Sequence, residues 1–196
     1  MLFYPRRIQD AWRMSESIKT IALHPPVLAA LEELYGRKPR PFQTLNFRVG
    51  TEQDAHSDTV HFNSKPPGYV AGVWVALEDM DMENGPLIYY PGSHKLPEVS
   101  MQDVGAEGPS QYDELYTRFI GDLIKREGLQ AEYATIRKGE ALVWSANLLH
   151  GGSPQRDKDR TRQSQVTHYF FEGCEYYSPL SSNEDYVHVL NPNWIG

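Results

Sequence analysis

The pattern of hydrophobic and polar positions predicts a helix near the start of the chain. In residues 25–35, the apolar side chains of Leu28, Leu31 and Tyr35 recur at three- and four-residue intervals, as they do on one face of a helix. The segment begins with two prolines, which the first turn of a helix tolerates, and Gly36 follows it as a stop. We therefore expect a helix over residues 25–35.

After this helix the pattern changes to short runs rich in β-branched and aromatic residues, and Gly- and Pro-containing turns separate them. Such runs are typical of β-strands. We expect strands at residues 42–49, 69–77, 86–90, 141–144 and 163–171.

A second helical pattern interrupts the strands at residues 112–128, where Leu115, Phe119 and Leu123 recur every four residues and Gly128 provides a stop. Many short strands with one or two helices packed outside favour a β-sandwich or jelly roll over alternating βαβ units. The sequence has no internal repeat, and 196 residues fall within the usual size of one domain. We expect a single domain, 1–196.

Composition and charge favour a globular protein that does not bind nucleic acid. With 40% hydrophobic and 12% aromatic residues, the chain has enough apolar material to fold unaided. The formal net charge of -7 disfavours a phosphate-binding surface, because affinity for nucleic acid comes mainly from clustered Lys and Arg. Cys174 is the single cysteine, which excludes an intrachain disulfide and fits a reducing compartment.

The sequence also predicts a cytoplasmic protein with no membrane partner. No stretch approaches the roughly 20 apolar residues needed to cross a bilayer. The first residues, MLFYPRRIQDAW, lack the continuous apolar segment of a signal peptide. The oligomeric state cannot be inferred from these features.

Two of the seven histidines stand in contexts that suit a metal site. His56 and Asp58 are two residues apart, and in an extended strand they would project from the same face. His150 lies 150 − 56 = 94 residues later, at the end of the strand-like segment 141–149. Two imidazoles and one carboxylate on one face of an octahedral ion leave three positions open, which is the arrangement that non-heme iron oxygenases use.

Other interpretations of these residues are open at this point. A His-x-Asp triplet arises easily by chance, so the same residues also fit surface or core positions. His61 competes with His56 as a ligand, although Asn63, two residues later, is a poorer anionic partner than Asp58. The triplet therefore needs support from the surrounding sequence.

Several motifs, in order along the chain, strongly resemble the phytanoyl-CoA dioxygenase family of 2-oxoglutarate oxygenases. In the first half they are AHSD at 55–58, GVWVAL at 72–77, ENGP at 83–86 and YPGSHK at 90–95. In the second half they are KGE at 138–140, NLLHG at 147–151 and RQSQVTHYF at 162–170. The resemblance implies a double-stranded β-helix, a cupin-like jelly-roll barrel with a few flanking helices.

The resemblance implies a metal site and a cosubstrate site. Fe(II) would be held by His56, Asp58 and His150, with 2-oxoglutarate as cosubstrate and O2 as oxidant. Arg162 is similar in position to the basic residue that pairs with the far carboxylate of 2-oxoglutarate, since a guanidinium binds a carboxylate through two parallel hydrogen bonds. Arg160 has the same strand parity and is the alternative anchor.

Further side chains could complete the cosubstrate site. Ser164 faces the same way as Arg162 and could donate a further hydrogen bond. Trp74 corresponds to an aromatic residue that lines the cosubstrate pocket of the family, and plain core packing is its alternative role. Asn46 and Gln43 precede the metal motif, and their polar groups could reach 2-oxoglutarate or substrate.

The reaction implied by the resemblance is hydroxylation of a small organic substrate, with release of succinate and CO2. A carboxylate at position 58 fills the site that related halogenases leave open for chloride. Family members usually carry an additional N-terminal region before the part that resembles residues 1–48, so the substrate pocket could lack a wall. The alternatives are a cupin-like metal enzyme that does not use 2-oxoglutarate and a catalytically silent jelly-roll binding domain.

Overall fold

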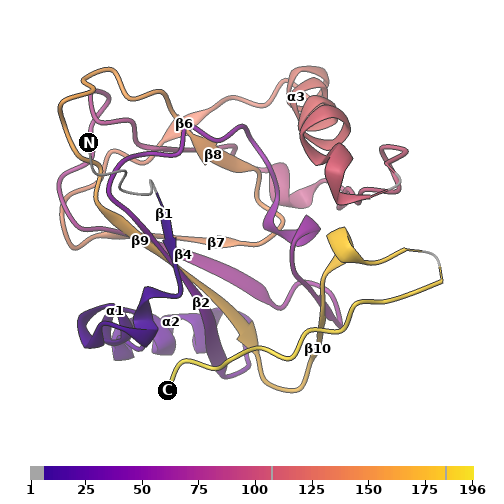
Figure 1. Ribbon diagram of the computed structural model, residues 1–196, viewed down its shortest axis with the longest axis horizontal. Helices are drawn as coiled ribbons and strands as arrows, with labels where there is room; N and C mark the ends of the chain where they lie inside the picture. Colours follow the sequence, from indigo (N-terminus) through magenta and orange to yellow (C-terminus); the bar gives the residue numbers. More distant parts are fainter. Residues whose placement is uncertain (1–6, 107, 184) are drawn as a thin grey trace.

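The computed structural model describes residues 7–106, 108–183 and 185–196, which form mainly β-sheet with a few helices (Figure 1). The strands are β1 (Arg7–Gln9), β2 (Pro39–Phe47), β3 (Asn63–Lys65), β4 (Val70–Ala76), β5 (Leu87–Tyr89), β6 (Glu132–Tyr133), β7 (Ala141–Ser145), β8 (His150–Gly152), β9 (Ser164–Phe171) and β10 (Glu175–Tyr177). The α-helices are α1 (Glu16–Ala22), α2 (Pro25–Tyr35) and α3 (Thr117–Arg126). No helix in these ranges is long and apolar enough to span a membrane.

The strands form a five-stranded sheet in the order β1-β2-β9-β4-β7, a three-stranded sheet in the order β6-β5-β8, and the pair β10-β3. Neighbouring strands run antiparallel. Because β9 lies between β2 and β4, the second half of the chain completes a sheet begun by the first. The predicted mainly β fold with flanking helices is confirmed, and closure into a double-stranded β-helix stays a prediction.

The two faces of the five-stranded sheet have different neighbours. Helices α1 and α2 lie against one face, where Leu31 of α2 packs in a cluster with Ala71, Val73, Tyr169 and Phe171 (Figure 1). The opposite face looks toward the three-stranded sheet, which lies on the other side of the molecule from these helices. Side chains alternate between the two faces along each strand, so every second residue of β2, β4 and β9 faces the space between the sheets.

Most element predictions agree with the structure. The predicted helix 25–35 is α2, and Gly36 ends it with a positive φ of 65°. Strand β2 begins at Pro39, three residues before the predicted start. Prolines are tolerated there because β1 pairs with β2 only from Leu45 onward, so this part of β2 lacks β1 as a neighbour. The helix expected at 112–128 begins as a π-helical turn, η5 (Tyr112–Tyr116), and continues as α3.

Two expectations about the metal motif were wrong. His56 and Asp58 do not share a regular strand: His56 forms an isolated β-bridge, and Asp58 begins a short 3₁₀ helix, η2 (Asp58–Val60). The Ser57 hydroxyl accepts a hydrogen bond from the backbone N–H of Thr59, which favours this turn over an extended chain. His150 does not end the strand that begins at residue 141, because β7 stops at Ser145 and His150 begins β8 in the other sheet.

Candidate active site

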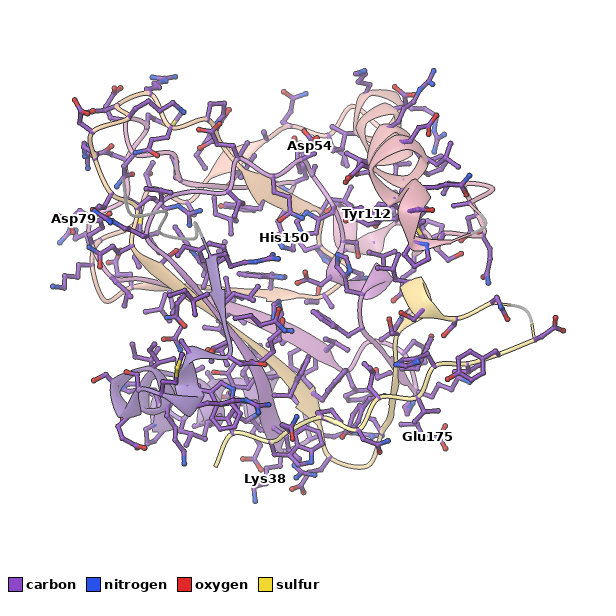
Figure 2. All side chains as sticks on the ribbon, in the orientation of Figure 1. Lys38, Asp54, Asp79, Tyr112, His150 and Glu175 are labelled. Carbon is purple, nitrogen blue, oxygen red and sulfur yellow. The ribbon has the colours of Figure 1, made fainter. Side chains whose placement is uncertain are left out.

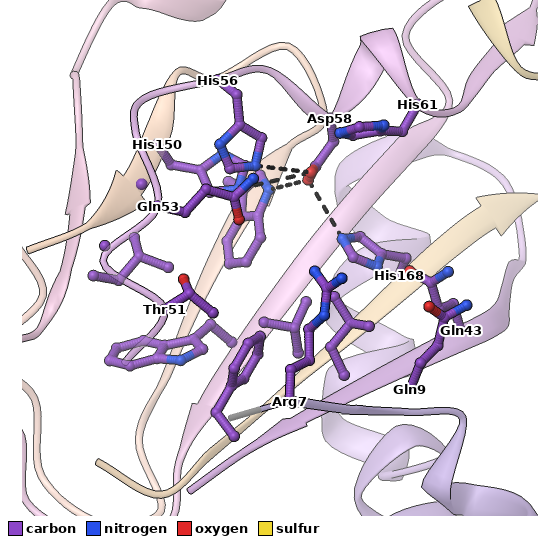
Figure 3. A pocket seen from close by; sticks show the side chains of 18 of the residues that line it. Arg7, Gln9, Gln43, Thr51, Gln53, His56, Asp58, His61, His150 and His168 are labelled. Atoms are coloured by element: carbon purple, nitrogen blue, oxygen red, sulfur yellow. Dashed lines mark hydrogen bonds and ion pairs between the residues drawn. The ribbon is translucent and has the colours of Figure 1, made fainter. Parts of the chain in front are cut away.

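A cavity of about 240 Å³ lies between the inner face of the five-stranded sheet and strand β8 (Figure 3). In Figure 2 the side chain of His150, a residue of β8, lies in the space between the two sheets. The cavity is lined by Arg7, Gln9, Gln43, Leu45, Phe47, Thr51, Gln53, His56, Asp58, His61, Phe62, Trp74, Leu87, Trp144, His150, Gly151, Gly152, Arg162, Val166 and His168. Its volume is slightly below the roughly 300–1,000 Å³ of typical ligand pockets, so it suits a small molecule.

The backbone places His56 and His150 side by side. The N–H of each residue donates to the carbonyl of the other, at 2.9 and 3.0 Å. Gly151 permits this approach, because a Cβ there would lie 2.7 Å from the carbonyl oxygen of Gln53. The two imidazole rings consequently lie 4.6 Å apart between centroids.

Backbone carbonyls orient both imidazoles. Nδ1 of His56 lies 2.9 Å from the carbonyl oxygen of Asp54, and Nδ1 of His150 lies 3.0 Å from that of Leu148. A carbonyl can only accept, so each Nδ1 carries the proton and each Nε2 presents a lone pair. Burial, followed by the proximity of His150, lowers the pKa of His56 to about 3, so its imidazole is neutral at physiological pH.

The carboxylate of Asp58 lies close to the Nε2 atoms of both histidines (Figure 3). Its Oδ1 lies 3.9 Å from Nε2 of His56 and 3.7 Å from Nε2 of His150, and all three side chains are buried. Burial acts to raise the pKa of Asp58, but the neighbouring His150, His168 and His56 outweigh it and hold the pKa well below its usual range. Asp58 is therefore an ionised carboxylate.

These three side chains fit a divalent transition metal. Their donor atoms, two imidazole nitrogens and one carboxylate oxygen, lie within 4.8 Å of one another. His61 lines the same cavity but lies outside this group, and its ring instead packs 5.3 Å from that of Tyr112 in η5. The donor set matches the two-histidine, one-carboxylate arrangement that non-heme iron uses, with the cavity open beside it.

A buried cation, Arg162, also lines the cavity. Arg162 is 4% exposed, its Nη1 donates to Ser164 Oγ at 2.9 Å, and its Nε is buried without a partner among the described residues. The guanidinium carbon lies 5.5 Å from the ring centres of both Phe47 and Trp74. Burial lowers the pKa of Arg162 to about 10, with Glu78 opposing the shift, so the side chain stays cationic at neutral pH.

Arg160, the alternative anchor, lies elsewhere. Its Nη1 contacts both carboxylate oxygens of Asp81, at 2.8 and 2.9 Å, and it does not line the cavity. The Arg162 guanidinium therefore has an open side toward the cavity, whereas that of Arg160 is paired with a carboxylate.

The structure brings together seven of the eight site residues that the sequence suggested, all except Asn46. His56, Asp58, His150, Arg162 and Trp74 line the cavity, and Ser164 contacts it through Arg162. Trp74 is fully buried, and its indole nitrogen has no partner in the described part of the chain. Asn46 is not brought to the cavity: it lies on the opposite face of β2, and its amide donates to Gln165 at 3.2 Å. Gln43, which has the opposite parity, does line the cavity.

Sequence reasoning missed two cavity residues that contact Asp58. Trp144 donates from its indole nitrogen to Oδ2 at 2.9 Å, and Nε2 of His168 lies 3.4 Å from the same oxygen. The alternation of side chains along β9 could have identified His168, because it has the parity of Ser164. The same alternation of side chains along β7 could have identified Trp144.

Comparison with known proteins supports this view of the fold. The sequence profile of the family described as phytanoyl-CoA dioxygenase (PhyH) matches residues 7–164. Among solved structures, the non-heme alpha ketoglutarate dependent epimerase SnoN superposes with a TM-score of 0.65 at 25% identity, over 87% of this chain and 64% of that one. EctD from S. alaskensis, solved with 2-oxoglutarate and 5-hydroxyectoine, superposes with a TM-score of 0.69 at 19% identity, over 91% of this chain and 61% of that one.

Curated relatives carry the same family description. Phytanoyl-CoA dioxygenase domain-containing protein 1 of Danio rerio is 50% identical over 139 residues, which cover 71% of this chain and 45% of that protein. The Mus musculus protein of the same name is 26% identical over 174 residues, 89% of this chain and 55% of that protein. The chain thus spans about half the length of the curated relatives it matches. With a profile match over most of its residues, the chain belongs to the phytanoyl-CoA dioxygenase family.

Proposed function

We propose that this chain is an Fe(II)- and 2-oxoglutarate-dependent dioxygenase that hydroxylates a small organic substrate and releases succinate and CO2. The observation that carries the proposal is the pairing, in one cavity, of the open His56, Asp58 and His150 donor set with the buried cation of Arg162. A metal site alone would suit many enzymes. A buried guanidinium that forms no ion pair among the described residues favours an anionic ligand, and a dicarboxylate has one acidic group for each end of this cavity.

His56, Asp58 and His150 would hold the iron through Nε2, Oδ1 and Nε2. When bound, Fe(II) supplies the activation of O2 that couples oxidative decarboxylation of 2-oxoglutarate to oxidation of the substrate. The carbonyls of Asp54 and Leu148 keep both imidazoles in the tautomer that can bind a metal. Related halogenases leave the coordination position of this carboxylate open for a halide. Asp58 would fill that position, which favours hydroxylation over halogenation.

Arg162 would bind the far carboxylate of 2-oxoglutarate. Its Nη1 is oriented by Ser164, and the rings of Phe47 and Trp74 flank the guanidinium and exclude water from it. A charge-assisted hydrogen bond is stronger in such a dry site than in water. The indole nitrogen of Trp74, which has no partner within the described ranges, offers a further donor to an oxygen-rich ligand.

Succinate formation tests the proposal. The purified chain is incubated with Fe(II), ascorbate, O2 and 2-oxoglutarate, alone and with pools of small molecules, and succinate is measured by mass spectrometry. We expect slow succinate release without substrate and faster release with a pool that contains one.

One control variant and two binding measurements on the parent separate this function from its alternatives. The Asp58→Ala variant should abolish succinate release. If the parent binds Fe(II) but never consumes 2-oxoglutarate, the chain is a cupin-like metal enzyme. If the parent binds neither Fe(II) nor 2-oxoglutarate, the catalytically silent binding domain is correct.

A further inference from the structure

Three neighbouring strands place three residues in one row beneath Asp58. His168 of β9 is paired with Gly72 of β4, and Gly72 is paired in turn with Trp144 of β7. Directly paired residues of antiparallel strands point to the same face of a sheet, and His168 and Trp144 both line the cavity. The row therefore consists of two ring-bearing side chains with a glycine between them.

Gly72 is needed for space rather than for backbone conformation. A Cβ on this residue would lie 2.3 Å from Cε2 of Trp144, 2.4 Å from Cζ2 and 2.7 Å from Nε1. Its φ does not fall in the left-handed region, so any residue could adopt its backbone angles. The indole of Trp144 occupies the volume that a side chain at position 72 would take.

In that position, Trp144 contacts two of the proposed metal ligands. Its Nε1 donates to Oδ2 of Asp58 at 2.9 Å, and its ring lies 4.7 Å from the ring of His150 between centroids. Trp144 is 3% exposed, so the hydrogen bond does not compete with bulk water. Trp144 thus orients the Asp58 carboxylate and packs against one side of the His150 ring.

His168 contacts the same carboxylate oxygen from the other end of the row. Its Nε2 lies 3.4 Å from Oδ2, and its ring packs 4.9 Å from that of Phe62. The other ring nitrogen, Nδ1, is buried with no partner among the described residues. Asp58 is therefore the polar contact that the described residues provide for this imidazole.

We propose that Trp144 and His168 are positioning residues for Asp58, and that Gly72 makes this possible by giving Trp144 its place. The inference rests on the proposed metal site. Both residues engage Oδ2, which leaves Oδ1 directed at Nε2 of His56 and of His150. The carboxylate would then offer the metal one fixed oxygen, and the ligand would be oriented before any metal arrives.

Titration with Co(II) in the absence of 2-oxoglutarate tests the proposal without relying on turnover. Trp144→Phe keeps an aromatic ring and removes the donor, so Co(II) affinity should fall about 10- to 100-fold, as for other groups that orient metal ligands. The visible absorption of bound Co(II), which reports its coordination, should change as well. The matched control is Trp194→Phe, which changes a tryptophan that packs against Tyr176 outside the cavity and should leave Co(II) affinity unchanged.

Two further sets of variants keep the test decisive if Trp144→Phe folds poorly, which the thermal midpoint of the metal-free protein will reveal. His168→Gln keeps an N–H near the position of Nε2 and should retain most Co(II) affinity, whereas His168→Leu should lose about 10-fold or more. Gly72→Ala should weaken Co(II) binding in the parent but add little in a Trp144→Leu background, where the clash is removed.

The outcomes separate this inference from the proposed function. Parental Co(II) affinity and absorption in Trp144→Phe and His168→Leu would overturn the positioning roles while leaving the metal site intact. Failure of the parent itself to bind Co(II) would overturn the metal site and with it the proposed function.

Discussion

At the scale of single residues, Arg160 and Arg162 are two positions apart and have opposite surroundings. Arg160 is neutralised by Asp81, whereas Arg162 is buried against Phe47 and Trp74, and its Nε has no partner among the residues that the structure describes. A buried cation without a counter-ion is costly unless a ligand supplies the charge. This asymmetry supports Arg162 as the 2-oxoglutarate anchor.

We expect Arg162→Ala to weaken 2-oxoglutarate binding about tenfold to a hundredfold, because hydrogen bonds to charged groups contribute roughly 1.5–3 kcal/mol. Metal affinity should stay close to that of the parent. Equilibrium binding of 2-oxoglutarate to the Co(II)-loaded protein measures the effect, and Arg160→Ala is the matched control. A larger loss in Arg160→Ala than in Arg162→Ala would contradict the assignment.

Asp58 allows a second prediction at this scale. Asp58→Ala removes the only anion of the proposed donor set, so metal affinity and succinate release should both collapse while the fold survives. Asp58→Glu keeps the charge but extends the reach by one methylene, and we expect partial metal binding with poor turnover. Metal titration and succinate assays measure both; full retention in Asp58→Ala would exclude a ligand role.

The alternation of side chains decides which residues could have been predicted. On β2, Gln43 lines the cavity, and so do Leu45 and Phe47, whereas Asn46 has the opposite parity. Gln43 and Asn46 could therefore not both reach the cavity from one regular strand. Applied along β9 from Ser164, the same rule would have found His168, but polarity alone does not distinguish the two faces.

At the scale of elements, the metal ligands depend on close contact between β8 and the segment before His56. Gly151 and Gly152 face the backbone of residues 52–55, and a Cβ on Gly151 would lie 2.7 Å from a carbonyl oxygen. A substitution there must push the two segments apart. The NLLHGG sequence therefore has a structural reason for its glycines beyond turn formation.

We predict that Gly151→Ala lowers both the thermal midpoint and the metal affinity, because separating the segments would disturb the reciprocal His56–His150 backbone bonds. The control is Gly121→Ala within α3, where nothing lies within 4 Å of the added Cβ. That variant should gain about 0.5–1 kcal/mol of stability, as alanine replaces glycine in a helix. Calorimetry and Co(II) titration compare the two, and equal behaviour would contradict the prediction.

Elements with strong periodicity could be predicted from the sequence, and those formed by tertiary contact could not. Residues 25–35 combine apolar spacing, an initial Pro-Pro and a final Gly, and their boundaries match α2. Strand β8, by contrast, has three residues, two of them glycine, and exists because it pairs with β5. Helix α1 was not predicted either, because its seven residues make just under two turns, too few for a repeating apolar face to stand out.

At the scale of the whole molecule, ligand binding should be visible as stability. A ligand at about 100 times its dissociation constant adds roughly 2.7 kcal/mol, which corresponds to about 5 to 11 °C for a chain of this size. We expect Co(II) to raise the thermal midpoint and 2-oxoglutarate to raise it further only when Co(II) is present. Differential scanning fluorimetry measures both shifts, and a chelator should reverse them. Equal stabilisation by 2-oxoglutarate with and without metal would contradict the proposal that the cosubstrate binds beside the metal.

The bridge between His56 and His150 has a consequence for how the chain is held together. A metal ion there would connect points 150 − 56 = 94 residues apart, as a crosslink does, in a chain whose single cysteine cannot form an intrachain disulfide. Links that close long loops restrict the unfolded chain most in theory. Unlike a disulfide, this link could be removed by a chelator, so iron supply in the cell would also govern how long the protein resists proteolysis.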